Sequence, residues 1–279
     1  MVFSCHACTV NRSEGTSLSK GTYLEDSLAH GVPSDAQIAK CISLIEDMQM
    51  NFEQLVRAMG SEATESAFVI GVTGSPGVGK SSFLNALLPY IKEGYGKVAI
   101  LAIDPSSHLS GGAILGDRIR ITESNFGEEL FFRSLATRGT YGGLSSVTAT
   151  VVQFLSKCGF ETVVIETVGV GQNEIEIVKI ANVVIHVIDS TAGDEIQLDK
   201  SGIMEIGDIY FVNKGDITNP SKFIANLRAS LHGEFRKNGI VPTVIAGSAK
   251  KGDGILETVS KINEYAVLEH KLDSGRPLT

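Results

Sequence analysis

Tryptophan is absent from this chain of 279 residues, and cysteine is scarce. The four thiols, at Cys5, Cys8, Cys41 and Cys158, are too few and too scattered for a disulfide framework, so we expect a reducing, cytoplasmic setting. No apolar run approaches ~18 residues, and a transmembrane helix is therefore not expected. The N-terminus lacks the basic-then-apolar pattern of a secretory signal, although its Ser/Thr content leaves a transit peptide open.

Basic side chains are in deficit, with 24 Lys and Arg against 32 Asp and Glu, a formal net charge of −8 and a pI near 5.3. Because nucleic-acid binding needs a basic surface, the charge predicts no nucleic-acid partner, and the missing apolar run predicts no membrane partner. The hydrophobic content of 43% and the 30 glycines are typical of a globular protein with many tight turns.

The most informative stretch joins an apolar run at 68–72 to a helical pattern at 82–88 through Gly74-x-x-x-x-Gly79-Lys80-Ser81. This strand–loop–helix order is the context of a phosphate-binding P-loop, and the full motif disfavours a glycine-rich turn without a ligand. Lys80 is expected to reach the β- and γ-phosphates, and the Ser81 hydroxyl to bind Mg²⁺. The predicted phosphate-binding residues are Gly74, Ser75, Pro76, Gly77, Val78, Gly79, Lys80, Ser81 and Ser82.

Strand and helix patterns alternate through the rest of the chain, which predicts an α/β P-loop NTPase fold: a doubly wound, mostly parallel sheet with helices on both faces. The expected strands are 68–72, 97–103, 131–134, 162–167, 183–189, 208–212 and 242–246. His186 alternates with apolar residues in its strand, so we interpret it as a hydrogen-bonded core histidine rather than a ligand.

The chain divides into four predicted parts. Residues 1–33 form a flexible tail, 34–60 an N-terminal helical extension that begins at a Ser34 cap, 61–270 the P-loop domain and 271–279 a C-terminal tail. Within the extension we expect a second short helix at 51–59, and within the domain a last helix at 254–268. The tail contains Cys5-His6-Ala7-Cys8, which could bind a soft metal, but no second cluster completes a tetrahedral site.

Two short motifs at strand ends identify the base. Asp216, in Asn213-Lys214-x-Asp216, can accept two hydrogen bonds from the N1–H and N2–H₂ edge of guanine, whereas adenine would leave this carboxylate unpaired at a cost of about 1–3 kcal/mol. Lys214 can lie along the base, and the backbone of Ser248-Ala249-Lys250 can donate to guanine O6. Together with the P-loop, these motifs predict GTP and GDP as ligands.

Acidic residues at the same predicted edge suit Mg²⁺, which prefers oxygen ligands. We expect Ser81, Asp104, Asp117 and Glu166 to hold the ion, and Lys80, Asp104, Asp117 and Glu166 to form the catalytic group. The Gly169 N–H should meet the γ-phosphate. No glutamine directly follows Gly169, which leaves the orientation of the attacking water open and predicts slow, partner-dependent Mg²⁺-dependent hydrolysis of GTP.

With these residues in view, the chain resembles the methylmalonyl-CoA mutase-associated GTPases, the MeaB/ArgK family. The most specific shared stretches are Asp104-Pro-Ser-Ser107 and Glu166-Thr-Val-Gly-Val-Gly-Gln172. The others are the P-loop, residues 111–117, 138–140, 192–195 and 202–205, the pair Asn213-Lys214, and 248–250.

The resemblance implies a GTP-hydrolysing chaperone that assists cofactor loading, protection or reactivation of an adenosylcobalamin-dependent acyl-CoA mutase. It also implies that residues 192–202 form the loop that couples hydrolysis to the mutase, through Asp194, Glu195, Gln197 and Lys200, although Ser201 replaces an expected basic residue. The family forms homodimers through a long helical arm, so a homodimer is one possible assembly, but the chain ends soon after the 254–268 helix. Two alternatives are a nickel-insertion GTPase for a hydrogenase or urease, and a kinase acting on a transport protein.

Overall fold

A computed structural model describes residues 33–47, 66–104, 130–136, 143–167, 177–191, 206–231 and 241–273. These residues contain a seven-stranded sheet in the order β3-β2-β4-β1-β5-β6-β7, in which every neighbouring pair is parallel. The strands are β1 Phe68–Thr73, β2 Val98–Asp104, β3 Leu130–Ala136, β4 Thr162–Thr167, β5 Val183–Asp189, β6 Ile209–Asn213 and β7 Thr243–Ala246. The helices are α2 Asp35–Glu46, α4 Lys80–Tyr95, α5 Gly143–Lys157, α7 Ser221–Ser230 and α8 Ile255–Asp273.

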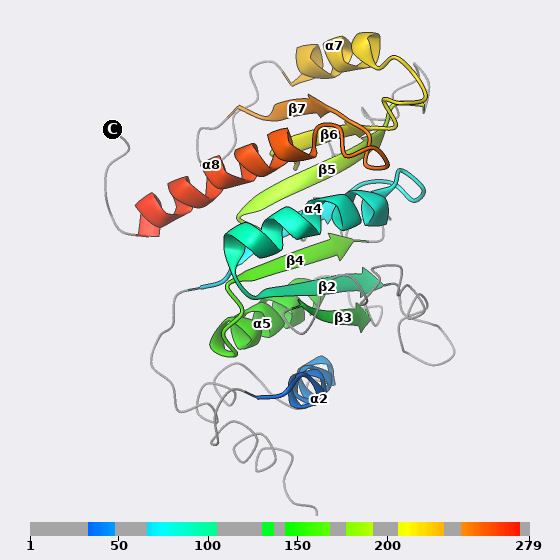
Figure 1. The fold of residues 1–279 in the computed structure, drawn as a ribbon. Coiled ribbons are helices and arrows are strands. Elements are labelled where there is room, and N and C mark those ends of the chain that lie inside the picture. The colour runs from blue at the N-terminus through cyan, green and yellow to red at the C-terminus, as the bar shows by residue number, and fades with distance from the viewer. Residues whose placement is uncertain are drawn as a thin grey trace, which may run out of the picture.

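Helices cover both faces of the sheet, which confirms the predicted α/β fold. Alternate strand residues pack with α4 and α8 on one face, in front of the sheet in Figure 1, and the others pack with α2, α5 and α7 on the opposite face. Parallel strands enclosed in this way are apolar along almost their whole length, because neither face meets water. Strand β6, which is buried at every position, is an example.

The N-terminal helix α2 is fastened to the edge strand β3. The helix begins at a capping box, as the sequence predicted for Ser34. The Ser34 side chain accepts from the Gln37 backbone, and the Ser34 N–H donates to the Gln37 side chain at 2.8 Å. At the other end Glu46, with only 8% of its surface exposed, accepts from the Arg133 guanidinium and from the Ala136 N–H, both at 3.1 Å. The helix therefore closes part of the free edge of the sheet.

The strand bounds agree with the sequence to within two residues, and 162–167 and 183–189 match in full. The last helix differs, because α8 continues to Asp273, five residues past the expected end. The short helix expected at 51–59 and the tail before residue 33 lie outside the described residues. Within the described part, no helix is both long and apolar enough to cross a membrane.

Parallel strands bring their carboxyl ends to one edge of the sheet, where the arrowheads meet in Figure 1. Thr73 ends β1 in the middle of the sheet, and the P-loop and α4 follow it directly. Asp189 at the end of β5 is in register with Asn213 at the end of β6. The topology therefore assembles residues from four distant stretches of the sequence beside the P-loop.

Candidate functional site

The loop from Gly74 to Gly79 curls closely against its neighbours. A Cβ atom on Gly74, whose φ is 138°, would lie 2.2 Å from the Val187 carbonyl oxygen. A Cβ atom on Gly79, whose φ is 96°, would lie 2.6 Å from Asn213 Nδ2. At these two positions the left-handed backbone and the close neighbours leave room for glycine alone. Helix α4 begins at Lys80, directly after Gly79. The start of α4 thus presents the positive end of its helix dipole to the loop.

The Lys80 ammonium lies inside this curl. Only 6% of Lys80 is exposed, and its Nζ donates to the carbonyl oxygens of Gly74 at 2.5 Å and Ser75 at 3.0 Å. A buried ammonium needs such partners, since taking it from water is otherwise very costly. A phosphate oxygen would be a stronger, charge-assisted acceptor than a carbonyl, so the side chain is suited to exchange one for the other.

Ser81 and Glu166 come together beside the loop. The Ser81 hydroxyl donates to Glu166 Oε1 at 3.0 Å, and Glu166 is 7% exposed near the end of β4. Asp104 ends β2, the strand that pairs with β4, so its backbone reaches the same edge. A hydroxyl and a carboxylate oxygen in contact are a donor set that fits Mg²⁺. Asp117 and Gly169 lie outside the described residues.

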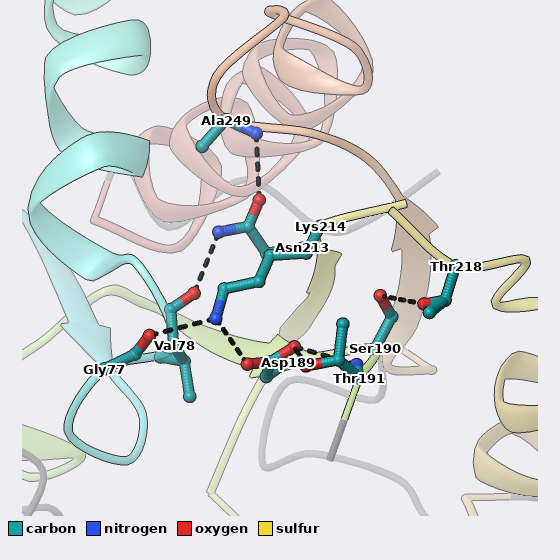
Figure 2. Close-up of polar contacts among 9 residues, drawn as sticks. All are labelled: Gly77, Val78, Asp189, Ser190, Thr191, Asn213, Lys214, Thr218 and Ala249. Carbon is teal, nitrogen blue, oxygen red and sulfur yellow. Dashed lines mark hydrogen bonds and ion pairs between the residues drawn. The ribbon is translucent and has the colours of Figure 1, made fainter. Parts of the chain in front are cut away.

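Asn213 joins the P-loop to the loop after β7. Its Nδ2 donates to the Val78 carbonyl oxygen and its Oδ1 accepts from the Ala249 N–H, both at 2.9 Å (Figure 2). With 4% exposure, the side chain is a buried brace between the phosphate loop and the predicted base-reading segments. The structure therefore brings the Asn213-Lys214 and Ser248–Lys250 motifs together at one place.

Asp216 is exposed, three residues after Asn213 in the sequence. A hydrogen bond from the Ser248 side chain lowers the pKa of Asp216 below its ordinary value, which keeps the carboxylate ionised and able to accept from a base. The backbone donors differ from the expectation, because Ser248 N–H already donates to the Asp253 carbonyl at 3.1 Å and Ala249 N–H to Asn213. Within the described residues, Lys250 N–H is the donor of this trio that remains for guanine O6.

Asp189, the last residue of β5, forms an ion pair with Lys214 that the sequence did not predict. Its Oδ2 accepts from Lys214 Nζ at 2.5 Å, and the same Nζ donates to the Gly77 carbonyl oxygen at 3.2 Å (Figure 2). Partial burial raises the pKa of Asp189, but the hydrogen bonds from Lys214 and Thr191 outweigh it and hold the pKa below its ordinary value. The signal available in the sequence was an acid at a predicted strand end one strand away from Lys214.

The interpretation of His186 as hydrogen-bonded was wrong in one respect. The residue is in the core of β5 and 4% exposed, but its Nδ1 is buried without a hydrogen-bond partner among the described residues. Burial, with a smaller effect of the Lys80 charge, lowers its pKa to about 4. The ring packs against Tyr210, with centroids 5.7 Å apart.

The remaining predicted residues cannot be placed. Two groups lie outside the described residues: the predicted coupling residues Asp194, Glu195, Gln197 and Lys200, and the N-terminal cysteines Cys5 and Cys8. Among residues that the structure does describe, no group of three or more His, Cys, Asp or Glu side chains could hold a metal ion. No nickel-type cluster therefore supports the insertion alternative within this part of the chain.

Comparison with known proteins agrees with this geometry. A Pyrococcus abyssi protein named as a GTPase is 38% identical over 230 residues, covering 81% of this chain and 71% of its own length. The mouse methylmalonic aciduria type A homolog, mitochondrial, is 34% identical over 217 residues, covering 76% and 52%. The crystal structure of an LAO/AO transport system kinase superimposes with a TM-score of 0.62 at 26% identity, covering 92% of this chain and 77% of the other.

The sequence model of one family matches residues 38–275, which is most of the chain and includes every strand of the sheet. That family is described as the methylmalonyl-CoA mutase-associated GTPase MeaB. Within that range lie the P-loop, Asn213 with its contact to Val78, and the exposed Asp216. The chain therefore belongs to the MeaB family of P-loop GTPases.

Proposed function

We propose that this protein hydrolyses GTP in order to assist an adenosylcobalamin-dependent acyl-CoA mutase, such as methylmalonyl-CoA mutase, in cofactor loading, protection or reactivation. The proposal of GTP hydrolysis is supported most by the Asn213 side chain, whose hydrogen bonds connect the P-loop at Val78 with the predicted base-binding segment at Ala249. The family description and the name of the mouse relative support the mutase half.

In the proposed reaction the P-loop N–H groups and the start of α4 bind the β- and γ-phosphates. Lys80 leaves the carbonyls of Gly74 and Ser75 and follows the charge that develops on the transferred phosphoryl group. Ser81 and Glu166, with Asp104 and Asp117, would hold Mg²⁺, which supplies neutralisation of phosphate charge when bound. The hydrogen bond from Ser81 already holds the Glu166 carboxyl beside the Ser81 hydroxyl.

Guanine selectivity is proposed to come from Asp216 and from the stem of Lys214. The ionised Asp216 carboxylate accepts from the N1–H and N2–H₂ edge, and Lys250 N–H donates to O6. Adenine would meet the same groups with an acceptor at N1 and no donor at C2, so the carboxylate would lose its hydrogen bonds on binding.

Coupling to the mutase is proposed to run through residues 192–202, which follow directly from the end of β5 at the nucleotide edge. A mutase that binds one nucleotide state better than the other must change GTP affinity or turnover by the same differential free energy. Asp194, Glu195, Gln197 and Lys200 supply charged and polar groups for that contact.

The test is phosphate release from GTP with and without a purified adenosylcobalamin-dependent acyl-CoA mutase. We expect about tenfold faster release with the mutase, a typical coupling magnitude. Lys200→Ala, and Asp194→Ala with Glu195→Ala, should reduce this stimulation while basal turnover is kept. Lys261→Ala on α8 is the charge-matched control and should respond like the parent, since its partner Glu264 is an exposed residue of the same helix. Equal stimulation of every variant, or none of the parent, would contradict the coupling proposal.

A kinase function is the second candidate, because the structural relative with a TM-score of 0.62 is described as a transport system kinase. A kinase would move the γ-phosphate to a protein acceptor instead of water. Incubation with γ-labelled GTP and candidate transport proteins distinguishes the two, since label on a protein rather than in free phosphate would support the kinase.

A further inference from the structure

Lys214 adopts a conformation that the surrounding structure must enforce. Its φ is 62°, and it is the one residue other than glycine with a positive φ in the described part of the chain. A residue other than glycine is sterically disfavoured in this left-handed backbone region, and it adopts this conformation where neighbouring contacts stabilise it. Its carbonyl oxygen accepts from the Ile217 N–H at 2.9 Å, and its Nζ donates to Gly77 O and Asp189 Oδ2.

These two acceptors are unequal. The Gly77 carbonyl is neutral and 3.2 Å away, whereas the Asp189 carboxylate is charged and 2.5 Å away. Charge-assisted hydrogen bonds are shorter and roughly twice as strong as neutral ones. The ion pair is also partly shielded from water, with 30% of the Lys214 side chain and 15% of the Asp189 side chain exposed. Asp189 is therefore the principal anchor of the ammonium.

Asp189 is itself held rigidly. Its second oxygen, Oδ1, accepts from the Thr191 N–H at 2.8 Å and from the Thr191 hydroxyl at 2.7 Å (Figure 2). The next residue, Ser190, donates its N–H to the Asn213 carbonyl at 3.1 Å and contacts Thr218 through its hydroxyl at 3.0 Å. Ser190, just after the end of β5, therefore contacts the chain both before Asp216, at Asn213, and after it, at Thr218.

We propose that Asp189 is a positioning residue for guanine-nucleotide binding that acts through Lys214 without touching the nucleotide. By fixing the ammonium against the P-loop, it sets the Lys214 stem as a preformed wall for the base and keeps the turn to Asp216 in place. A preformed wall raises affinity, because the nucleotide does not have to order it. The inference rests on the proposed GTPase function.

The experiment measures the Kd for GDP and the KM and kcat for GTP in the full-length parent and in Asp189→Asn. Asparagine keeps an oxygen that can accept from Thr191 but removes the charge that anchors Lys214. We expect Kd and KM to rise about tenfold, which corresponds to about 1.4 kcal/mol, with kcat at saturating GTP unchanged. Thr191→Val keeps the Asp189 charge and removes only one of the two hydrogen bonds that Thr191 donates to it, so Kd and KM should rise much less than in Asp189→Asn.

A double-mutant cycle with Lys214→Met shows whether the effect passes through Lys214, since methionine keeps the stem and removes the ammonium. In that background Asp189→Asn should cause no further rise in Kd. Asp189→Glu gives a second test if the asparagine variant does not fold, and it should bind GDP with a Kd between those of the parent and of Lys214→Met.

Three outcomes would overturn the inference: an unchanged Kd in Asp189→Asn, the same rise in the Lys214→Met background, or a glutamate variant that binds as weakly as Lys214→Met. Failure of the parent to bind GDP or GTP would instead remove the proposed function. The two failures are thus distinguishable from one set of titrations.

Discussion

At the scale of single residues, the chemistry of the ligand decides what a sequence can reveal. The role proposed for Asp216 comes from the sequence, because guanine presents two donors on one edge and a carboxylate is the side chain that accepts both. The roles proposed for Lys80 and Ser81 come from the fixed spacing of the P-loop. The ion pair of Asp189 with Lys214 could not be derived in this way, because it depends on the parallel register of β5 and β6, which neither strand encodes locally.

His186 provides a test at this scale. Burial lowers its pKa from 6.5 to about 4, so the unfolded chain binds a proton at a higher pH than the folded one. Stability is therefore full above pH 6.5 and is lost as the pH falls toward 4. Over the interval from pH 7 to pH 4.5 this group should cost roughly 2–3 kcal/mol.

The measurement is reversible urea unfolding of the parent and of His186→Leu at both pH values. The leucine variant lacks the titrating ring and does not suffer this loss. Between pH 7 and pH 4.5, the free energy of unfolding of the variant minus that of the parent should therefore rise by roughly 2–3 kcal/mol. A pH-independent difference between the two proteins would show that the buried imidazole does not govern this acid sensitivity.

At the scale of elements, hydrophobic patterning predicted the strands well and the ends of the helices less well. Strands β4 and β5 contain the apolar runs 163–165 and 183–185, and their predicted bounds match the structure in full. Helix α8 continues to Asp273, because residues 269–273 include neither glycine nor proline and so give no stop signal in the sequence. The packing of α2 on β3 was likewise invisible, since it depends on contacts 87 to 90 residues apart.

The α2–β3 contact predicts a large effect of one substitution. Glu46→Ala would leave the Arg133 guanidinium without its carboxylate and the Ala136 N–H without an acceptor, and we expect a loss of about 2–3 kcal/mol in the free energy of unfolding. Urea unfolding would measure it. Glu264→Ala removes the exposed pair with Lys261 on α8 and should change stability by less than about 0.5 kcal/mol. Similar losses in the two variants would show that Glu46 is not a special contact.

At the scale of the whole molecule, alternation of strands and helices was enough to predict a parallel sheet with helices on both faces. The order of the strands was beyond reach, because it is fixed by long-range pairing such as that of β2 between β3 and β4. That order matters for function: it puts β1 in the centre and gathers the ends of β4, β5 and β6 around the P-loop. The division at residues 33, 60 and 270 stays a proposal.

The most direct test of the account is steady-state phosphate release from GTP, ATP and xanthosine triphosphate by the parent, Asp216→Asn and Lys80→Ala. The parent should hydrolyse GTP and leave ATP almost untouched. Asp216→Asn should lose GTP and gain xanthosine triphosphate, since the new amide donates where the carboxylate accepted. Lys80→Ala should release no phosphate from any of them. Hydrolysis of ATP as readily as GTP by the parent, or unchanged turnover in Lys80→Ala, would contradict the account.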